Sequence, residues 1–179
     1  MKFDVIIIGG GLAGMTAGVA LRKAGKRCLV VSEGLSLHET PRSEYLSLGG
    51  ILMAGDSVLS GVWEGDVLKS VRTRNMEGTV LEADAYILCT GKFFSKGLVS
   101  SMDGIVEPVF GCDVIYDRDN WVSSDFFAPQ PFERFGIATS EGRAVIGGKA
   151  AANLYAAGEV VAGDVDIIDS ALEVCRRLI

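Results

Sequence analysis

The sequence predicts an α/β fold in which a central, mainly parallel sheet is joined to a β-meander. Residues 4–8 form a β-branched run that leads directly into spaced glycines and an apolar helical pattern. Residues 58–89 alternate between apolar and polar side chains, and residues 153–160 form a late apolar segment with glycine and glutamate near its end. The chain has 179 residues, of which 49% are hydrophobic, so we expect a single domain over residues 1–179.

Three glycines separate the first predicted strand from the first predicted helix. Gly9 lets the chain turn, Gly11 lets a pyrophosphate approach the backbone, and Gly14 lets the helix lie close to the sheet. The helix is expected over residues 12–24, with its N-terminal N–H groups and positive dipole end toward the phosphates. Together with a second strand at residues 27–32, this unit predicts a Rossmann-like FAD/NAD(P)-binding fold. The alternative is a glycine-rich turn that binds nothing.

The acidic residue that normally ends the second strand and binds a ribose hydroxyl is displaced in this chain. Ser32 occupies the usual position of the acid, and Glu33 follows one residue later. Glu33 reaches the ribose if the strand ends one residue late, and a solvated loop carboxylate is the equal alternative. We therefore include both residues in the candidate cofactor site.

Composition and charge argue against several classes of function. A net charge of −6 with dispersed Lys and Arg disfavours a nucleic-acid partner. No apolar run approaches the about 18 residues that cross a membrane, and the early first strand leaves no room for a signal peptide, so a cytoplasmic protein is expected. The four cysteines are far apart and the single histidine, His38, lies in a polar stretch, so no metal site is expected.

Residues 35–56 show no clear periodicity and are expected to form a loop over the ligand edge of the sheet. Arg42 and Ser43 lie in this stretch and could contact phosphate, and a solvated loop is the alternative. The meander that follows is expected to contain strands at residues 58–63, 66–73 and 79–89. Its last strand runs into Thr90-Gly91 and would return beside the first strand, with its carboxyl end at the ligand crevice. A final helix is expected at residues 169–178.

The order of these elements resembles the two-dinucleotide-binding-domain flavoproteins. In that superfamily, a glycine-rich βαβ unit, a meander, a strand ending in Thr-Gly and a late Gly-Glu segment converge on a flavin. Here the strand ends at Gly91, and the late segment is Gly158-Glu159. The resemblance implies that Glu159 binds the ribityl chain and that Gly158 permits its close approach.

A longer aromatic and proline-rich string is similar to the B subunits of the anaerobic glycerol-3-phosphate dehydrogenases. The string runs through residues 91–98, 104–108 and 125–136, and the resemblance covers about residues 1–40 and 50–163. It implies a flavin-carrying subunit with FMN, or alternatively FAD, in anaerobic respiration. Its partners would be a catalytic FAD subunit and an iron-sulfur membrane-anchoring subunit, which pass electrons from glycerol 3-phosphate toward quinone at the inner membrane.

Two departures from the family pattern leave a second hypothesis open. Residues 35–56 stand where the family has a long middle region, and Asp164, Asp166 and Asp169 stand where it has a glycine-rich turn. These carboxylates would oppose a second phosphate at the last helix. The alternative is therefore a dinucleotide-binding module that has a structural or regulatory role without turnover.

The sequence contains no identifiable side-chain base for cleavage of a carbon–hydrogen bond, so we assign substrate oxidation to a partner and name no catalytic residue. Lys92 and Lys96 could stabilise a reduced flavin, and a solvated position is the alternative. The phenylalanines of the string are expected mostly to pack in the core, and the alternative is a wall against the flavin or an interface with a partner. They are Phe126, Phe127, Phe132 and Phe135.

Overall fold

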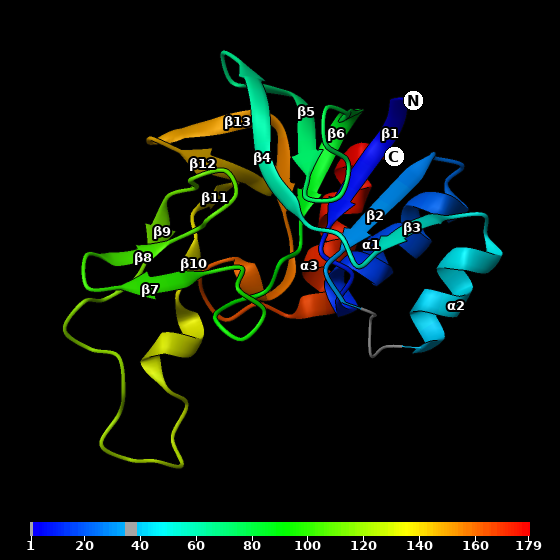
Figure 1. Ribbon diagram of the computed structural model, residues 1–179. Coiled ribbons are helices and arrows are strands. Elements are labelled where there is room, and N and C mark those ends of the chain that lie inside the picture. The colour runs from blue at the N-terminus through cyan, green and yellow to red at the C-terminus, as the bar shows by residue number, and fades with distance from the viewer. Residues whose placement is uncertain (1, 35–38) are drawn as a thin grey trace.

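The computed structural model describes residues 2–34 and 39–179, so His38 lies outside the described residues (Figure 1). In the first half of the chain, the elements are β1 (Lys2–Ile8), α1 (Leu12–Lys23), β2 (Cys28–Ser32), α2 (Glu39–Ser47), β3 (Ile51–Ala54), β4 (Val58–Glu64), β5 (Val67–Thr73) and β6 (Val80–Leu88). In the second half, they are β7 (Val99–Ser101), β8 (Gly104–Val106), β9 (Val114–Ile115), η1 (Pro131–Arg134), β10 (Gly136–Ile137), β11 (Thr139–Ser140), β12 (Arg143–Ile146), β13 (Lys149–Ala156), η2 (Gly158–Val160) and α3 (Ile167–Leu178).

Nine strands of the described chain form one sheet, in the order β11-β12-β13-β6-β1-β2-β3 with the β4-β5 hairpin attached to β6. The pairs around β1 are parallel: Ile7 lies opposite Val30 of β2 and Ile87 of β6. Strands β4, β5 and β6 pair antiparallel in sequence order. The predicted α/β fold with a central, mainly parallel sheet and a β-meander is therefore confirmed.

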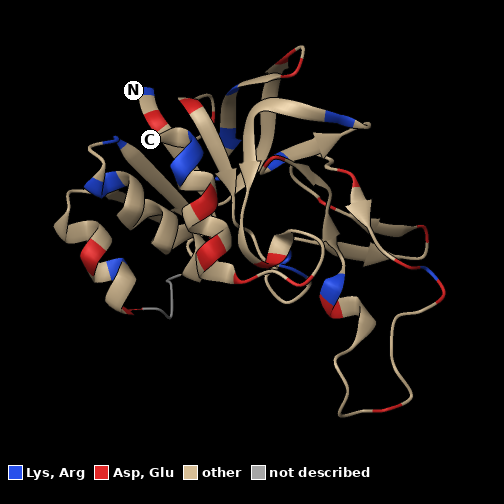
Figure 2. Ribbon diagram, turned by 180° about the vertical axis from the view of Figure 1, so that it is seen from behind, with Lys and Arg blue, Asp and Glu red and all other residues tan. Residues whose placement is uncertain are grey.

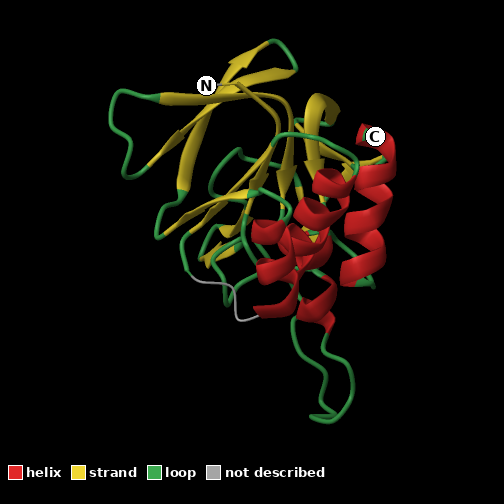
Figure 3. Ribbon diagram, turned by 90° about the vertical axis from the view of Figure 1, so that its right-hand side faces the viewer, coloured by secondary structure: helices red, strands yellow, loops and turns green. Residues whose placement is uncertain are grey.

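The central strands β1 and β2 are buried on both faces of the sheet, which explains why they are almost continuously apolar. Val5 and Ile7 face α1 and α3, whereas Ile6 and Ile8 face the opposite way and pack with residues of the meander such as Leu68. Figure 3 shows the helices gathered on one side of the sheet. The carboxyl ends of β1, β2 and β6 are thus fixed between two packed layers.

The last helix begins two residues earlier than expected because Asp166 caps it, accepting a hydrogen bond from the Asp169 N–H at 2.9 Å. Arg176 and Arg177 lie in its last turn, so the charges at both ends suit the helix dipole (Figure 2). In the part of the chain that the structure describes, no helix is long and apolar enough to span a membrane.

The expectation of a loop over residues 35–56 is wrong where the structure describes this stretch, because α2 and β3 lie there. Tyr45 organises both elements: its side chain is fully buried, and its hydroxyl lies 2.9 Å from the carbonyl oxygen of Cys28 and 3.0 Å from that of Ile51. Gly18 and Gly50 leave room for the ring, since a Cβ on either would collide with it. One buried aromatic residue, rather than a periodic pattern, fixes this helix and strand.

The expected core packing of the phenylalanines holds at only one end of the string. Phe135 is 5% exposed, but Phe126 and Phe127 are 85% and 94% exposed. They lie on a long connection between β9 and η1 that projects from the body of the molecule (Figure 1). The expectation is wrong for these two residues, because the segment that carries them extends away from the sheet.

Candidate functional site

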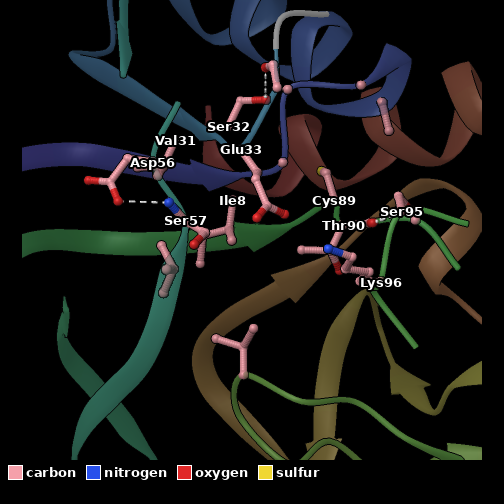
Figure 4. Close-up of a pocket in the computed structure, with 18 of the residues that line it drawn as sticks. Ile8, Val31, Ser32, Glu33, Asp56, Ser57, Cys89, Thr90, Ser95 and Lys96 are labelled. Atoms are coloured by element: carbon pink, nitrogen blue, oxygen red, sulfur yellow. Dashed lines mark hydrogen bonds between the residues drawn. The ribbon is translucent and has the colours of Figure 1, made fainter. Parts of the chain in front are cut away.

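A cleft of about 850 Å³ opens where the carboxyl ends of β1, β2 and β6 meet. The glycine-rich turn after β1 forms one wall, and the segments after β2, β3 and β6 form the others. Arg74 after β5, Glu159 of η2, the start of β4, the segment after β8 and the first residue of α3 also line the cleft, part of which is drawn in Figure 4. This is the edge of a parallel sheet at which nucleotides bind in folds of this kind.

The three glycines of the turn have different structural roles. Gly9 has a φ of 107°, and a Cβ there would collide with the carbonyl oxygen of Cys89 on the neighbouring chain segment. A Cβ on Gly14 would collide with the carbonyl oxygen of Gly9, so the close approach of α1 requires glycine. Gly11 differs, because nothing lies within 4 Å of the position its Cβ would take.

The N-terminus of α1 is open to the cleft at Gly11. This residue is the N-cap, makes no side-chain capping hydrogen bond, and is followed by a first turn without acidic residues. Free N–H groups and the positive end of the helix dipole attract phosphate. The turn therefore fits an anionic pyrophosphate.

The structure separates the two candidates for ribose binding. Ser32 is the last residue of β2, is 8% exposed, and donates its hydroxyl hydrogen to the carbonyl oxygen of Gly34 at 2.7 Å. Glu33 projects into the cleft (Figure 4). Its Oε1 lies 2.8 Å from Nη2 of Arg74. The hydrogen bond from Arg74 and the charge of Lys96 hold the pKa of Glu33 below its usual range. Glu33 is thus an ionised acceptor at the cleft.

Arg74 is a cleft residue that sequence reasoning missed, and the buried carboxylate of Asp56 explains its position. Asp56 is 2% exposed, and its Oδ1 accepts hydrogen bonds from the N–H groups of Ser57 at 2.8 Å and Asn75 at 3.0 Å. The N–H of Arg74 donates to the carbonyl oxygen of Ser57 at 2.9 Å. These bonds tie the end of β5 to the segment after β3. The Gly-Asp pair after the apolar residues 51–54 was the available sequence signal.

Gly91 and the late Gly158-Glu159 segment meet at another part of the cleft. Gly91 has a φ of 71°, and a Cβ on it would lie 3.9 Å from Oε2 of Glu159. Gly158 does not line the cleft but packs behind it, since a Cβ there would lie 2.6 Å from the Cβ of Ala13 in α1. The structure therefore brings Gly9, Gly11, Ser32, Glu33, Gly91 and Glu159 to one lining, with Gly14 and Gly158 supporting α1 beside it.

The two lysines after Gly91 have different surroundings. Lys96 lines the cleft, has a φ of 61°, and acts electrostatically on Glu33. Lys92 donates a hydrogen bond to the backbone carbonyl of Glu133; burial lowers its pKa, although the nearby carboxylates of Glu159 and Glu133 oppose this shift. Lys96 thus belongs with Glu33 and Arg74, while Lys92 holds two backbone segments together.

Other polar candidates lie elsewhere or are inert. Arg42 and Ser43 are on α2, which contributes no residue to the described lining of the cleft. Cys89 lines the cleft, but burial raises its pKa, so that it remains a neutral thiol and packs as a small apolar group. Cys28 is buried as expected, and burial raises its pKa to about 12.

The hydroxyl oxygens of Ser57 and Thr90 are buried and have no hydrogen-bond partner among the described residues. Both residues line the cleft. Their oxygen atoms have almost no accessible surface, so they lie behind the surface that a ligand in the cleft would contact. The open α1 N-terminus and the ionised Glu33 together fit a dinucleotide such as FAD.

Comparison with known proteins supports this interpretation. A family model described as "FAD binding domain" matches residues 4–41 and 34–170. The oxidoreductase from Agrobacterium tumefaciens superposes with a TM-score of 0.61 at 14% identity, covering 99% of this chain and 97% of that one. Thioredoxin reductase from T. acidophilum superposes with a TM-score of 0.55 at 13% identity, covering 99% and 96%. At these identities the likeness shows the fold. The family match indicates FAD, so FMN as the main choice of cofactor is not supported.

The curated relatives that this chain matches are B subunits of anaerobic glycerol-3-phosphate dehydrogenases. The relative from Vibrio vulnificus (strain YJ016) is 40% identical over 136 residues, which are 73% of this chain and 31% of the relative. The protein of the same name from Haemophilus influenzae (strain ATCC 51907) is 38% identical over 130 residues, which are 68% of this chain and 30% of the relative. The chain thus spans about a third of the length of these relatives. It belongs to the FAD binding domain family, and its curated homologues at about 40% identity are B subunits of anaerobic glycerol-3-phosphate dehydrogenase.

Proposed function

We propose that this chain binds FAD in the cleft and serves as an electron-transfer subunit of an anaerobic glycerol-3-phosphate dehydrogenase. One observation carries the proposal: the open N-terminus of α1 at Gly11 and the ionised Glu33–Arg74 pair line the same cleft. The first suits a pyrophosphate and the second suits an adenosine ribose. FAD has both a pyrophosphate and an adenosine ribose, whereas FMN has neither, which is why we propose FAD in place of FMN.

Each part of the lining has a proposed role toward the cofactor. Backbone N–H groups at Gly11 and in the first turn of α1 hold the pyrophosphate, and Arg74 and Lys96 add positive charge beside it. Glu33 accepts hydrogen bonds from the ribose hydroxyls, and Glu159 binds the ribityl chain. When bound, the flavin supplies reversible electron transfer, and the protein binds, orients and tunes it.

The described lining of the cleft offers little for oxidation of glycerol 3-phosphate by this chain. Arg74 and Lys96 are its only basic residues, and no histidine lies among its described residues. Removing hydride from a secondary alcohol requires a positioned base, and a phosphate dianion requires clustered cations. The isolated chain is therefore inactive toward this substrate, and oxidation takes place on a partner.

The proposed partners are a catalytic FAD subunit, which donates electrons, and an iron-sulfur membrane-anchoring subunit, which passes them toward quinone. The complex lies in the cytoplasm, peripherally at the inner membrane. The relatives are named as one subunit of a larger enzyme, which supports membership of a multi-subunit complex.

A dinucleotide-binding module without turnover is the second candidate. The acidic start of α3 favours it, because Asp164, Asp166 and Asp169 would repel a further phosphate there. Such a module would bind a dinucleotide but would exchange no electrons with a partner.

The absorption spectrum and the released cofactor of the purified chain test the proposal. We expect the yellow spectrum of oxidised flavin and about one FAD per chain after denaturation. A colourless chain that releases a nicotinamide dinucleotide would favour the binding module. Release of FMN would refute the assignment of Glu33 to an adenosine ribose.

A further inference from the structure

The acid that follows β2 is displaced by one residue, and the displacement changes the face of the sheet on which its side chain lies. Side chains along a strand alternate between the two faces. In β2, Val30 packs with residues of α1 and α3, whereas Val31 packs with residues of the meander. By this alternation Ser32 lies on the helix side of the sheet. Glu33 leaves the strand on the meander side, where β5 ends.

The backbone that carries Glu33 is held on both sides. The hydroxyl of Ser32 donates to the carbonyl oxygen of Gly34 at 2.7 Å, which closes the bend around Glu33. The carbonyl oxygen of Ser32 accepts hydrogen bonds from the N–H groups of Gly55 at 2.8 Å and Asp56 at 3.2 Å. Because the hydroxyl of Ser32 is already bonded within the chain, Glu33 is the residue of this bend that remains for a ribose.

The backbone beside Arg74 is tied to the same segment after β3. The N–H of Arg74 donates to the carbonyl oxygen of Ser57 at 2.9 Å. The neighbouring Asn75 donates its N–H to Oδ1 of Asp56 and its side-chain amide to the carbonyl oxygen of Gly55, both at 3.0 Å. Arg74 therefore approaches the bend after β2 from a fixed base.

The ion pair between Arg74 and Glu33 completes a ring of hydrogen bonds that joins the ends of β2, β3 and β5. Nη2 of Arg74 bonds Oε1 of Glu33 at 2.8 Å, with the two side chains 51% and 48% exposed. Ion pairs of this exposure contribute little to stability. Within residues 2–34 and 39–179, Oε2 of Glu33 accepts no hydrogen bond. The pair thus fixes one oxygen of the carboxylate and leaves the other open to the cleft.

We propose that Arg74 is a positioning residue, which holds the displaced carboxylate of Glu33 so that its Oε2 accepts a hydrogen bond from the adenosine ribose of FAD. This rests on the proposed function, because that function supplies the FAD. A glutamate side chain loses rotamer freedom when it binds a ligand, and a side chain that is already held loses less. Arg74 thereby restores, from the meander, a ribose contact that the last residue of β2 does not make.

A double-mutant cycle on FAD affinity tests the proposal. FAD is titrated into the FAD-free parent, Arg74→Ala, Glu33→Ala and the double variant. Each single variant should lower FAD affinity about tenfold, because the same charged hydrogen bond is lost or misplaced. In the Glu33→Ala background, Arg74→Ala should lower it less than about threefold, the remainder being the charge that Arg74 adds beside the pyrophosphate.

Arg72→Ala is the matched control, because Arg72 is an exposed arginine of β5 outside the described lining of the cleft. This variant should bind FAD as the parent does. Arg74→Ala should unfold at the same urea concentration as the parent, since the ion pair is exposed. A loss of FAD affinity then reports on the site and not on the fold.

The pKa of the Glu33 carboxyl in the FAD-free chain gives a second readout, measured by NMR titration. The hydrogen bond from Arg74 and the charge of Lys96 hold this pKa below its usual range. Arg74→Ala should therefore raise the pKa of Glu33, whereas Arg72→Ala should leave it unchanged. An unchanged pKa in Arg74→Ala would show that Arg74 does not hold the carboxylate, and would overturn the proposal.

The cycle separates this role from the proposed function. An equal loss of FAD affinity from Arg74→Ala with and without Glu33 would overturn the positioning role. Arg74 would then contact the cofactor independently of Glu33, and the assignment of FAD to the cleft would stand. Failure of the parent to bind FAD would overturn the proposed function, and the positioning role with it.

Discussion

Replacing Asp56 with Ala should both destabilise the chain and weaken FAD binding. The carboxylate is 2% exposed and pairs with two backbone N–H groups, those of Ser57 and Asn75. Hydrogen bonds to a charged group contribute about 1.5–3 kcal/mol each, and a buried unpaired N–H adds a desolvation cost. We expect the free energy of unfolding to fall by about 3–5 kcal/mol. The segment that places Arg74 beside Glu33 would lose its hydrogen bonds to Asp56, so FAD affinity should fall as well.

The pH dependence of this effect has a definite sign. Burial by itself raises the pKa of Asp56, but the Thr73 side chain and the N–H groups of Asn75 and Ser57 outweigh burial and hold the pKa below its usual range. Because the folded-state pKa is below the unfolded-state value of about 3.9, the carboxylate stabilises the fold at neutral pH. That contribution disappears as the pH falls below about 4.

Urea unfolding of the parent, Asp56→Ala and Asp56→Asn between pH 3 and pH 7 measures the loss of stability and its pH dependence. The difference in the free energy of unfolding between the parent and Asp56→Ala should be constant above about pH 5. It should decrease at lower pH, as the carboxylate of the parent is protonated. Asp56→Asn keeps an acceptor oxygen and should lose only about 1–2 kcal/mol at pH 7. Two results would refute this account: a loss of stability below about 1 kcal/mol for Asp56→Ala, or a difference in stability between this variant and the parent that increases on acidification.

Three further predictions concern the ligand, the fold and the chemistry. Glu33→Ala should lower FAD affinity about tenfold, because a hydrogen bond to a charged group is lost, and should leave FMN affinity unchanged. Equal FAD affinity of the variant and the parent in a fluorescence titration would show that Glu33 is a solvated side chain that binds no ribose. Tyr45→Ala should destabilise the chain by about 3–5 kcal/mol, and a change below about 1 kcal/mol in urea unfolding would show that α2 and β3 are held by other contacts. Mixing the FAD-loaded chain with glycerol 3-phosphate alone should not bleach the flavin in a stopped-flow experiment, and rapid bleaching would place the catalytic site in this chain.

The parts of the fold that could be predicted from the sequence are those whose signals are local. The β-branched residues of β1 and the glycines at 9, 11 and 14 lie within one short stretch. Gly9 and Gly14 are required by close backbone contacts, and Gly11 leaves space for a ligand. The meander has a period of two that each strand displays by itself. Such features do not depend on what the rest of the chain does.

The parts that could not be predicted depend on contacts between distant residues. The helix α2 has one buried residue, Tyr45, so its apolar pattern is too weak to mark a helix. Arg74 reaches Glu33 across 41 positions of sequence, and nothing near either residue indicates the pair. Phe126 and Phe127 are as apolar as core residues, and only the course of the chain shows that they face solvent.

A comparison of FAD binding by the parent and by Gly11→Val tests the central claim most directly. The substitution adds a branched side chain where nothing lies within 4 Å, at a backbone φ of −72° that valine adopts, so the chain should fold as before. We predict that the parent binds about one FAD per chain, whereas Gly11→Val binds none, because its side chain occupies the space of the pyrophosphate. The FAD-free forms of the two proteins should unfold within about 1 kcal/mol of each other, the cost of valine at the N-cap of α1. Equal FAD binding by both proteins would contradict the placement of the cofactor in this cleft.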